Sequence, residues 1–418
     1  MEILQLVRNN FTELVNLRRY LHKHPELSGC EEQTVAYIEM KLSGYGIAYT
    51  TVPNGGVVGV IEGCKPGKTL LLRADMDALP IKESACNLQN EKICLSENEG
   101  VSHACGHDAH TAMLLVASKI LQQQRQNWPG KIVLCFERGE EGAGNIKYLL
   151  DYIENYSDLK IDGCYGTHVR WNVPVGKMVI QSGAVMAGGF GFEIRLTGRG
   201  GHGSRPDMAN SPLDCFTAIY HNVNMLRLRK VTPFECLTFS IGKVYCGEKL
   251  NIVPDELTFA GTARFFDLEA AGQPFIDEFL KIVVNECSSF GCTFEVLHMP
   301  KPIYEVRNDP VCTKLAQQAV TKCLGTEVLT DVEPWMASET MSTYLKLYPG
   351  VFTFTGIANA AKGTGANHHT PEFDVDEDGM LTGAAAAIAY ALEFLNYPEE
   401  IAFTRNIVSV KDLTSRNI

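Results

Sequence analysis

The sequence lacks several features that would assign it to a common class of protein. None of its 14 cysteines belongs to a C-x-x-C pair, which argues against a zinc ribbon and against a thioredoxin-type dithiol. The sequence has no Lys/Arg-rich run, LRLRK at 226–230 being the closest to one, and acidic residues outnumber basic ones by 49 to 37. A net charge of −12 argues against the basic patch that nucleic acid requires, so no nucleic-acid partner is expected.

Long apolar segments are also missing from the sequence. No apolar run approaches the ~18–20 residues that cross a membrane, so no membrane partner is expected. The N-terminal segment MEILQLVRNNFTELV lacks the basic start and unbroken apolar core of a signal peptide, and its Leu, Val and Phe recur at helical spacing. We therefore expect a cytoplasmic protein whose cysteines are mostly small buried apolar residues.

The length and the order of elements predict more than one domain. A chain of 418 residues fits two or three domains at roughly 150 residues each. Strand-like and helix-like segments alternate in 1–186 and again in 301–418, which predicts an α/β domain with a mixed, mainly parallel sheet and flanking helices. Residues 187–300 contain the pattern of two helices among about four strands, which predicts a small inserted α+β domain.

Most of the histidines occupy positions that suit a functional site. Seven of the eleven fall in loops or at predicted strand ends, often beside glycine, where α/β proteins build their sites. We interpret His22 and His24 as surface or capping residues, and His221 and His298 as ordinary members of the inserted domain. The seven candidates are His103, His107, His110, His168, His202, His368 and His369.

The segment HACGHDAH at 103–110 combines three histidines with a cysteine and an aspartate. On a helix, Cys105 and His107 would point about 200° apart, whereas in an extended loop before a helix they can converge on one ion. A thiolate, an imidazole and carboxylates together suit a divalent transition metal. The alternative for this segment alone is a loop whose histidines only cap the helix that follows.

Acidic pairs follow two of the predicted strands. Glu140 and Glu141 come just after the buried strand KIVLCFE, and Asp75 and Asp77 end another strand with both side chains on one side. One carboxylate of Glu140 and Glu141 can bind a metal while the other takes a proton from water, although a solvated acidic loop is the alternative. With HACGHDAH, the strand end at His168 and the loop NHHTPEFD, five motifs stand at strand-to-loop transitions, and a shared metal site explains them better than coincidence does.

In the order of its motifs, the sequence resembles the M20 metallopeptidase-like amidohydrolases, and within them the hippurate hydrolases, aminoacylases and auxin-conjugate hydrolases. Each motif is weak alone, but the set is specific and covers nearly the whole chain. The motifs are LHKHPELSGCEEQT, RADMDALPI, HACGHDAH, EEGAGN, GTHV, GRGGHGSRP, NIVPDE, GTARFF, ASET and HHTPEFDVDE. The resemblance implies a two-metal catalytic domain and an inserted dimerisation or lid domain.

The resemblance also implies an activity, which is hydrolysis of N-acyl amino acids or related small-molecule amide conjugates. The two divalent metals would be manganese or zinc, with cobalt or nickel as alternatives, and the protein would be a homodimer through the inserted domain or a higher oligomer. Glu140 would be the general base, Asp77 would orient a metal ligand, and His202 would polarise the scissile carbonyl in the partner subunit's site. Asn251 and Arg264 would contact the substrate. The implied metal ligands are Cys105, His107, Glu141, His168 and His369.

The sequence departs from the family pattern at three places. FERGEE stands where the family usually has FQPAEE, so that Arg138 could pair with one of the two following glutamates. ASETMSTYL and GSRPDMANSP also differ from the usual sequences, and the roles of Glu339, His103 and His368 stay open. These departures indicate a subgroup with its own substrate preference.

Three alternative functions also stay open. A dipeptidase or aminopeptidase would use the same scaffold and differ only in its substrate. A cysteine hydrolase would use Cys105 with His107 or His110 and no metal, but it would leave the acidic pair and the distant histidines without a role. A catalytically inactive binding or scaffold protein would keep the metal and lack turnover.

Overall fold

The chain folds into two compact units. The first unit contains residues 2–183, 307–333 and 343–405, and the second contains 184–306 and 334–342. The domain limits expected from the sequence, at residues 186 and 300, stay a prediction. The residues that the computed structural model describes are 2–142, 144–405, 409–410 and 413.

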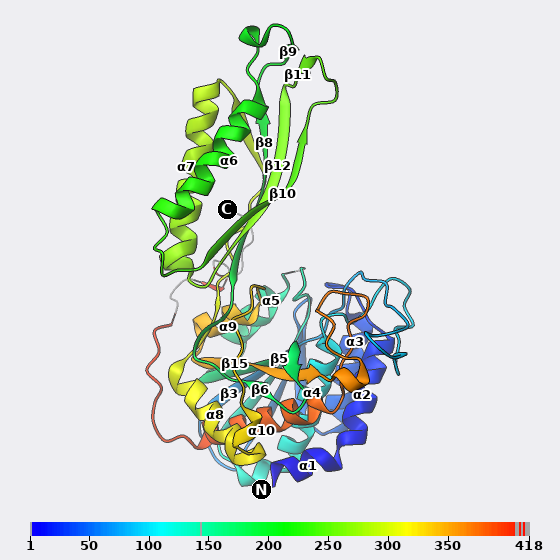
Figure 1. Cartoon of the computed structure of the whole chain (residues 1–418). Helices are drawn as coiled ribbons and strands as arrows, with labels where there is room; N and C mark the ends of the chain where they lie inside the picture. The colour runs from blue at the N-terminus through cyan, green and yellow to red at the C-terminus, as the bar shows by residue number, and fades with distance from the viewer. Residues whose placement is uncertain (1, 143, 406–408, 411–412, 414–418) are drawn as a thin grey trace. The chain divides into compact units, whose positions relative to one another are not determined.

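The first unit is built on a seven-stranded sheet (Figure 1). In order across the sheet, the strands are β1 (Ala48–Val52), β2 (Gly56–Glu62), β4 (Lys131–Glu137), β3 (Thr69–Asp75), β5 (Gly163–Pro174), β15 (Gly350–Ala358) and β6 (Met178–Val179). The four central strands β4, β3, β5 and β15 run parallel, whereas β1, β2 and β6 extend the edges with antiparallel pairs. This arrangement confirms the expected mixed α/β fold with a mainly parallel centre.

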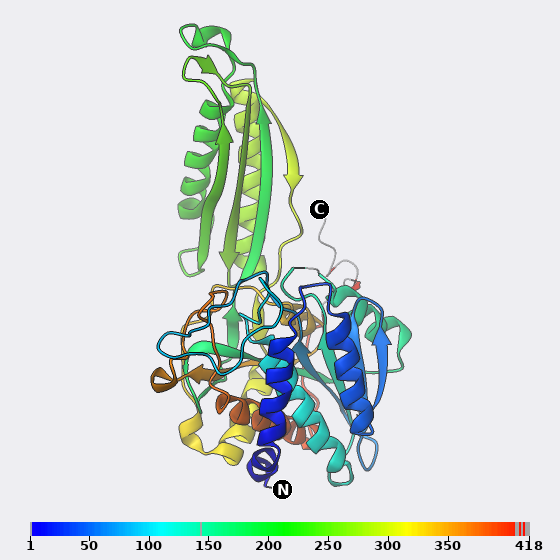
Figure 2. The same cartoon turned by 90° about the vertical axis from the view of Figure 1, so that its right-hand side faces the viewer.

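Helices cover both faces of this sheet (Figures 1 and 2). They are α1 (Ile3–Asn9), α2 (Phe11–Lys23), α3 (Glu32–Gly44), α4 (His107–Gln123), α5 (Ile146–Asp151), α8 (Pro310–Leu324), α9 (Met341–Leu347) and α10 (Gly379–Asn396). α4 and α10 pack against β3 and β5 on one face, and α5 and α9 lie on the other side. Because both faces are covered, the central strands read as nearly continuous apolar runs in the sequence.

Helix α10 has the length and apolar composition of a membrane span, a feature that the sequence analysis missed. It is 18 residues long, and 78% of its apolar window is buried inside the structure. It packs against α4, α8 and β15, and its run of alanines at 384–387 brings those neighbours close. A core helix passes the same test of length and composition, and its burial explains its apolar surface.

The second unit contains a separate antiparallel sheet and its own apolar core. In order, the strands of this sheet are β10 (Leu237–Cys246), β12 (Glu256–Phe265), β8 (Gly188–Thr197) and β13 (Thr293–His298). Helices α6 (Pro212–Arg229) and α7 (Gln273–Phe290) pack together on one face of this sheet (Figure 1). Two further short strand pairs are β9 (Gly201–His202) with β11 (Ile252–Val253), and β7 (Gly183–Met186) with β14 (Val306–Asn308) at the limits of this unit.

The parallel strands of the first unit end at one edge of their sheet. Asp75, the last residue of β3, lies beside Glu137, the last residue of β4. Arg73 pairs with Gly166 of β5, so His168 is level with Asp75. Side chains that follow these strand ends therefore gather at the edge where open α/β sheets bind ligands.

Candidate metal centre

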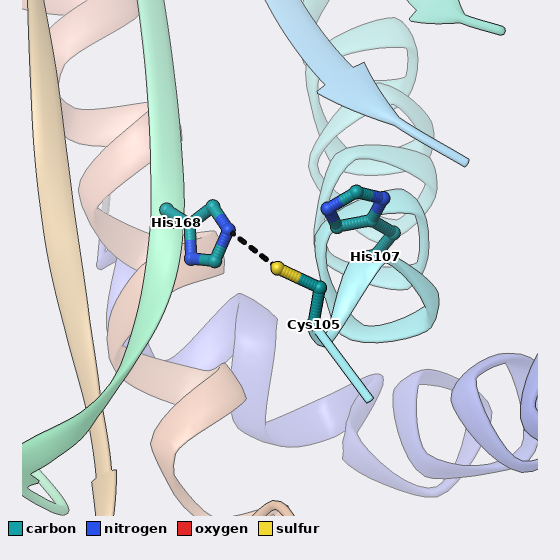
Figure 3. Close-up of side chains that lie close together, drawn as sticks. All are labelled: Cys105, His107 and His168. Atoms are coloured by element: carbon teal, nitrogen blue, oxygen red, sulfur yellow. Dashed lines mark hydrogen bonds between the residues drawn. The ribbon is translucent and has the colours of Figure 1, made fainter. Parts of the chain in front are cut away.

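The turn that leads into α4 points two metal-binding side chains the same way. Gly106 has a φ of 91°, and a Cβ atom there would come within 2.3 Å of the Cγ2 atom of Val169. Only glycine meets both demands without strain. Cys105 therefore leaves the loop and His107 begins the helix with their side chains facing His168 on β5 (Figure 3). This confirms the convergence that the sequence predicts for an extended loop before a helix.

The distances around Cys105 suit donors that share a metal ion. Its Sγ atom lies 3.4 Å from Nε2 of His168 and 3.3 Å from Nε2 of His369. In a tetrahedral zinc site with sulfur and nitrogen ligands, the donor atoms are about 3.5 Å apart. Cys105 belongs to two groups of mutually close donors, one with His107 and His168 and one with Glu141 and His369.

A buried polar atom supports a cation at this place. Nδ1 of His107 donates to Oδ1 of Asp77 over 2.9 Å, which leaves the Nε2 lone pair directed into the site. That Nε2 atom is buried and forms no hydrogen bond with any residue that the structure describes, and it lies 3.9 Å from the buried Oε1 of Glu141. A buried acceptor without a donor is costly, and a metal ion removes that cost. The residues present therefore fit a divalent cation.

Asp77 and the loop after β4 hold the acidic half of the site. Oδ2 of Asp77 accepts a 2.8 Å hydrogen bond from the backbone N–H of Glu141. Oε1 of Glu141 lies 3.0 Å from Nε2 of His369, and a carboxylate oxygen of Glu140 lies within 4.8 Å of donor atoms of His107 and Glu141. His369 itself has a φ of 62°, a strained backbone for a residue other than glycine, and such strain clusters at functional sites.

The environment sets the protonation of these groups. Burial raises the pKa of the Cys105 thiol well above its usual value, and Glu141 adds to the effect. Burial and the neighbouring His110 hold the pKa of His168 well below its usual value, so this imidazole is neutral, as a ligand must be. Burial also opposes ionisation of Asp77, but the hydrogen bond from His107 outweighs it and lowers that pKa. Cys105 therefore needs a cation to become a thiolate.

His110 has a role that the sequence did not reveal. Its Nε2 atom accepts a 2.8 Å hydrogen bond from the backbone N–H of Val169, and its Nδ1 donates to Asp75 over 2.6 Å. Both nitrogens are therefore occupied, and His110 does not bind metal even though it lies close to His107. The carbonyl of Val169 in turn accepts a 2.6 Å hydrogen bond from Nδ1 of His168, which directs Nε2 of His168 toward Cys105. The helical spacing of His107 and His110 was the only signal for their proximity.

Two expectations from the sequence were wrong. His22 is buried rather than a surface or capping residue, and its ring lies between Asp108, at 2.8 Å, and Glu83, at 2.9 Å. Arg138 does not pair with Glu140 or Glu141, because its guanidinium donates to the carboxylates of residue 31, just before α3, and of residue 32, the first residue of α3. Both partners are distant in sequence, so no local pattern identifies them.

The three remaining candidates lie in the second unit. His202 on β9 is exposed, and its Nδ1 accepts from the N–H of Ser204, which leaves Nε2–H as an outward donor. Asn251 directly precedes β11, whose Ile252 pairs with His202. Arg264 pairs with Gly189 at the opposite end of the sheet. The ten residues of β8 separate the two ends by about 30 Å, so one chain does not bring Arg264 and His202 together.

Comparisons with known proteins agree with this geometry. Residues 71–393 match the model of peptidase family M20/M25/M40. The chain belongs to this family. Thermostable carboxypeptidase 2 of Saccharolobus solfataricus is 33% identical over 95% of this chain and 100% of its own length. IAA-amino acid hydrolase ILR1-like 2 of Arabidopsis thaliana is 32% identical over 92% of this chain and 86% of its own length.

A solved structure shows a similar fold. It is a Bacillus subtilis protein described as a dinuclear metal binding peptidase from the M20 family. The two structures align with a TM-score of 0.77 and 27% identity, over 93% of this chain and 99% of the other. Membership of the M20 family makes this protein an enzyme that carries out metal-dependent hydrolysis of amide bonds.

Replacing the sulfur ligand tests the metal centre. We expect Cys105→Ser to bind zinc or manganese more weakly than the wild type, because a neutral hydroxyl replaces a thiolate. The loss should exceed the about 10–100-fold that removal of an outer hydrogen-bond partner typically causes. Isothermal titration calorimetry with the metal measures this loss of affinity. The variant Cys86→Ser, at an exposed cysteine, is the control. Unchanged affinity in Cys105→Ser would remove this residue from the site.

Removing one contact of His110 tests its positioning role. In His110→Asn the amide nitrogen can still donate to Asp75, but nothing accepts from the N–H of Val169. We expect metal affinity to fall by about 10–100-fold, as for other outer partners of metal ligands, while the fold stays intact by circular dichroism. An affinity equal to that of the wild type would show that Val169 holds His168 without help.

Proposed function

We propose that the protein hydrolyses N-acyl amino acids or related amide conjugates, with two divalent metal ions, manganese or zinc, held by Cys105, His107, Glu141, His168 and His369. The observation that carries this proposal is the cluster of donor atoms with the carboxylate of Glu140 at its edge. The family relative that acts on an IAA-amino acid conjugate supports the substrate class. We also propose a cytoplasmic location for the enzyme, which would keep its free cysteines reduced.

Each group of the site has a task in the reaction. A bound divalent cation lowers the pKa of a coordinated water and polarises the amide carbonyl. Glu140 takes the proton of the attacking water as general base and returns it to the leaving nitrogen. Asp77 keeps the His107 ring and the Glu141 backbone at fixed positions through its two hydrogen bonds.

The grouping of donors supports a pair of ions rather than one. Cys105 and Glu141 each belong to more than one group of close donors, so one residue can serve two ions. The Bacillus subtilis relative with a similar fold is described as dinuclear. A thiolate with several imidazoles favours zinc, and the carboxylates suit manganese.

We propose that the active enzyme is a homodimer in which His202 acts in the partner's site. Its Nε2–H is free to donate to the oxygen that becomes negative during attack, an interaction typically worth about 3–4 kcal/mol in such sites. The separation of His202 from Arg264 along the sheet supports the pairing, because two copies can supply both groups to one substrate where one copy cannot.

The competing functions make different demands. A peptidase that requires a free amine is the second candidate, because a carboxypeptidase is among the relatives. A cysteine hydrolase is disfavoured, since burial raises the pKa of Cys105 and both nitrogens of His110 already have partners. A panel of N-acyl amino acids and unblocked dipeptides, with products detected by mass spectrometry, distinguishes the N-acyl amino acid hydrolase from the peptidase. Absence of turnover on the whole panel would favour an inactive binding protein.

Paired substitutions separate the roles of the two adjacent glutamates. We expect Glu140→Gln to keep its metal and to lose about 10²–10⁴-fold in turnover, because an amide cannot take the proton. Glu141→Gln should instead lose metal. Metal content by mass spectrometry, measured together with turnover, decides between them, and loss of metal from Glu140→Gln would reverse the two assignments.

Mixing two inactive variants tests the role of His202. We expect His202→Ala to lower turnover strongly and to keep its metal. In heterodimers with Glu140→Gln, one of the two sites combines an intact Glu140 with an intact His202 from the other subunit, so activity should return. Differently tagged subunits allow the heterodimers to be purified and verified. Verified heterodimers that stay inactive would show that His202 does not act across the interface.

A further inference from the structure

A buried carboxylate outside the metal centre holds the loop that carries Glu140. Glu31 lies just before α3 and is fully buried. Its Oε1 accepts hydrogen bonds from the backbone N–H of Gly29, at 2.9 Å, and of Gly139, at 2.8 Å. Gly139 is the residue directly before Glu140. A single carboxylate therefore joins the segment before α3 to the loop after β4.

Arg138 completes this connection from the other side. Its Nε donates to Oε2 of Glu31 over 2.8 Å, and its Nη2 donates to the carbonyl of Gly29 over 3.0 Å. Nη2 also donates to Glu32 over 2.9 Å, but the Glu32 side chain is 70% exposed, whereas that of Glu31 is 0% exposed. Exposed ion pairs contribute little, so the buried contact with Glu31 is the one that fixes the loop.

The glycines of this loop make a connection from outside it important. Gly139 and Gly142 flank the two glutamates with φ values of 72° and 158°, and glycine loses more conformational freedom on ordering than any other residue. Asp77 holds Glu141 through its backbone N–H. The hydrogen bonds from Gly139 and Arg138 to Glu31 fix the chain on the other side of Glu140.

We propose that Glu31 and Arg138 are positioning residues for the general base, and that they act on turnover through Glu140 without binding metal or substrate. This inference rests on the proposed function. Asp77 keeps the metal-binding Glu141 in place on its own, so breaking the contact with Glu31 moves Glu140 and spares the metal centre. A displacement of about 1 Å in a reacting group can lower the rate by about 100-fold.

A matched pair of substitutions tests the proposal. Glu31→Gln removes the charge that binds Arg138, and Glu32→Gln makes the same chemical change at the exposed partner of the same arginine. We expect Glu31→Gln to lower kcat by about 10–100-fold, with KM and metal content unchanged, and Glu32→Gln to change none of them. Arg138→Lys, which keeps the charge and loses the forked geometry, should fall between the wild type and Glu31→Gln.

A double-mutant cycle distinguishes positioning from a general structural effect. If Glu31 acts through Glu140, adding Glu31→Gln to Glu140→Gln should cause no further loss of the residual turnover. Losses that simply multiply would overturn the proposal, and so would loss of metal from a folded Glu31→Gln variant. Should Glu31→Gln fail to fold, the same cycle with Arg138→Lys gives the same decision.

Hydrogen exchange of the loop provides a readout that does not depend on activity. We expect the amide of Gly139 to exchange faster in Glu31→Gln than in the wild type and in Glu32→Gln, by mass spectrometry of peptides that span this loop. If exchange is faster in Glu31→Gln but the wild type hydrolyses no substrate, the contact is supported and the proposed function is overturned. Hydrolysis by the wild type with unchanged exchange and unchanged kcat in Glu31→Gln would overturn the positioning role alone.

Discussion

The two hydrogen bonds of Asp77 are the interaction on which the site depends. One oxygen binds the ring of His107 at the start of α4, and the other binds the backbone of Glu141 after β4. The two oxygens of one carboxylate are about 2.2 Å apart. The start of α4 and the loop after β4 are therefore held at a fixed short distance from each other. Without Asp77, the hydrogen bonds that hold the imidazole of His107 and the carboxylate of Glu141 near each other would be lost.

The same device recurs around the site, with a buried carboxylate joining two segments each time. Asp75 connects β3 with His110 of α4, and Glu137 connects β4 with β3 through Arg73. Buried charges are costly unless they are paired and hydrogen-bonded, and each of these carboxylates has a cationic or N–H partner. Nε2 of His107, which is buried among these paired groups, forms no hydrogen bond with any residue that the structure describes.

The sequence predicted the fold and the convergence of Cys105, His107 and His168, because both depend on patterns along the chain. Strand and helix periodicity indicated the α/β layers, and the ends of parallel strands necessarily meet at one edge. It failed where the partners are far apart in the chain. His22 meets Asp108 across 86 residues and Arg138 meets Glu31 across 107, and residue type alone does not say which distant charges will face each other. The membrane-like composition of α10 was missed because glycine, alanine and threonine interrupt its strongly apolar residues.

The hydrogen-bond partner of each histidine's second nitrogen separates the proposed metal ligands from the positioning histidine at this site. His107 gives Nδ1 to Asp77 and His168 gives Nδ1 to the carbonyl of Val169, so each keeps Nε2 available for the proposed metal. His110 is equally buried and close to both, yet its Nε2 accepts from Val169, and nothing remains for a metal. Outer partners that set the tautomer are a general feature of metal sites. The three neighbouring histidines therefore differ in function because their backbone and carboxylate partners differ. Residue type alone does not reveal these partners.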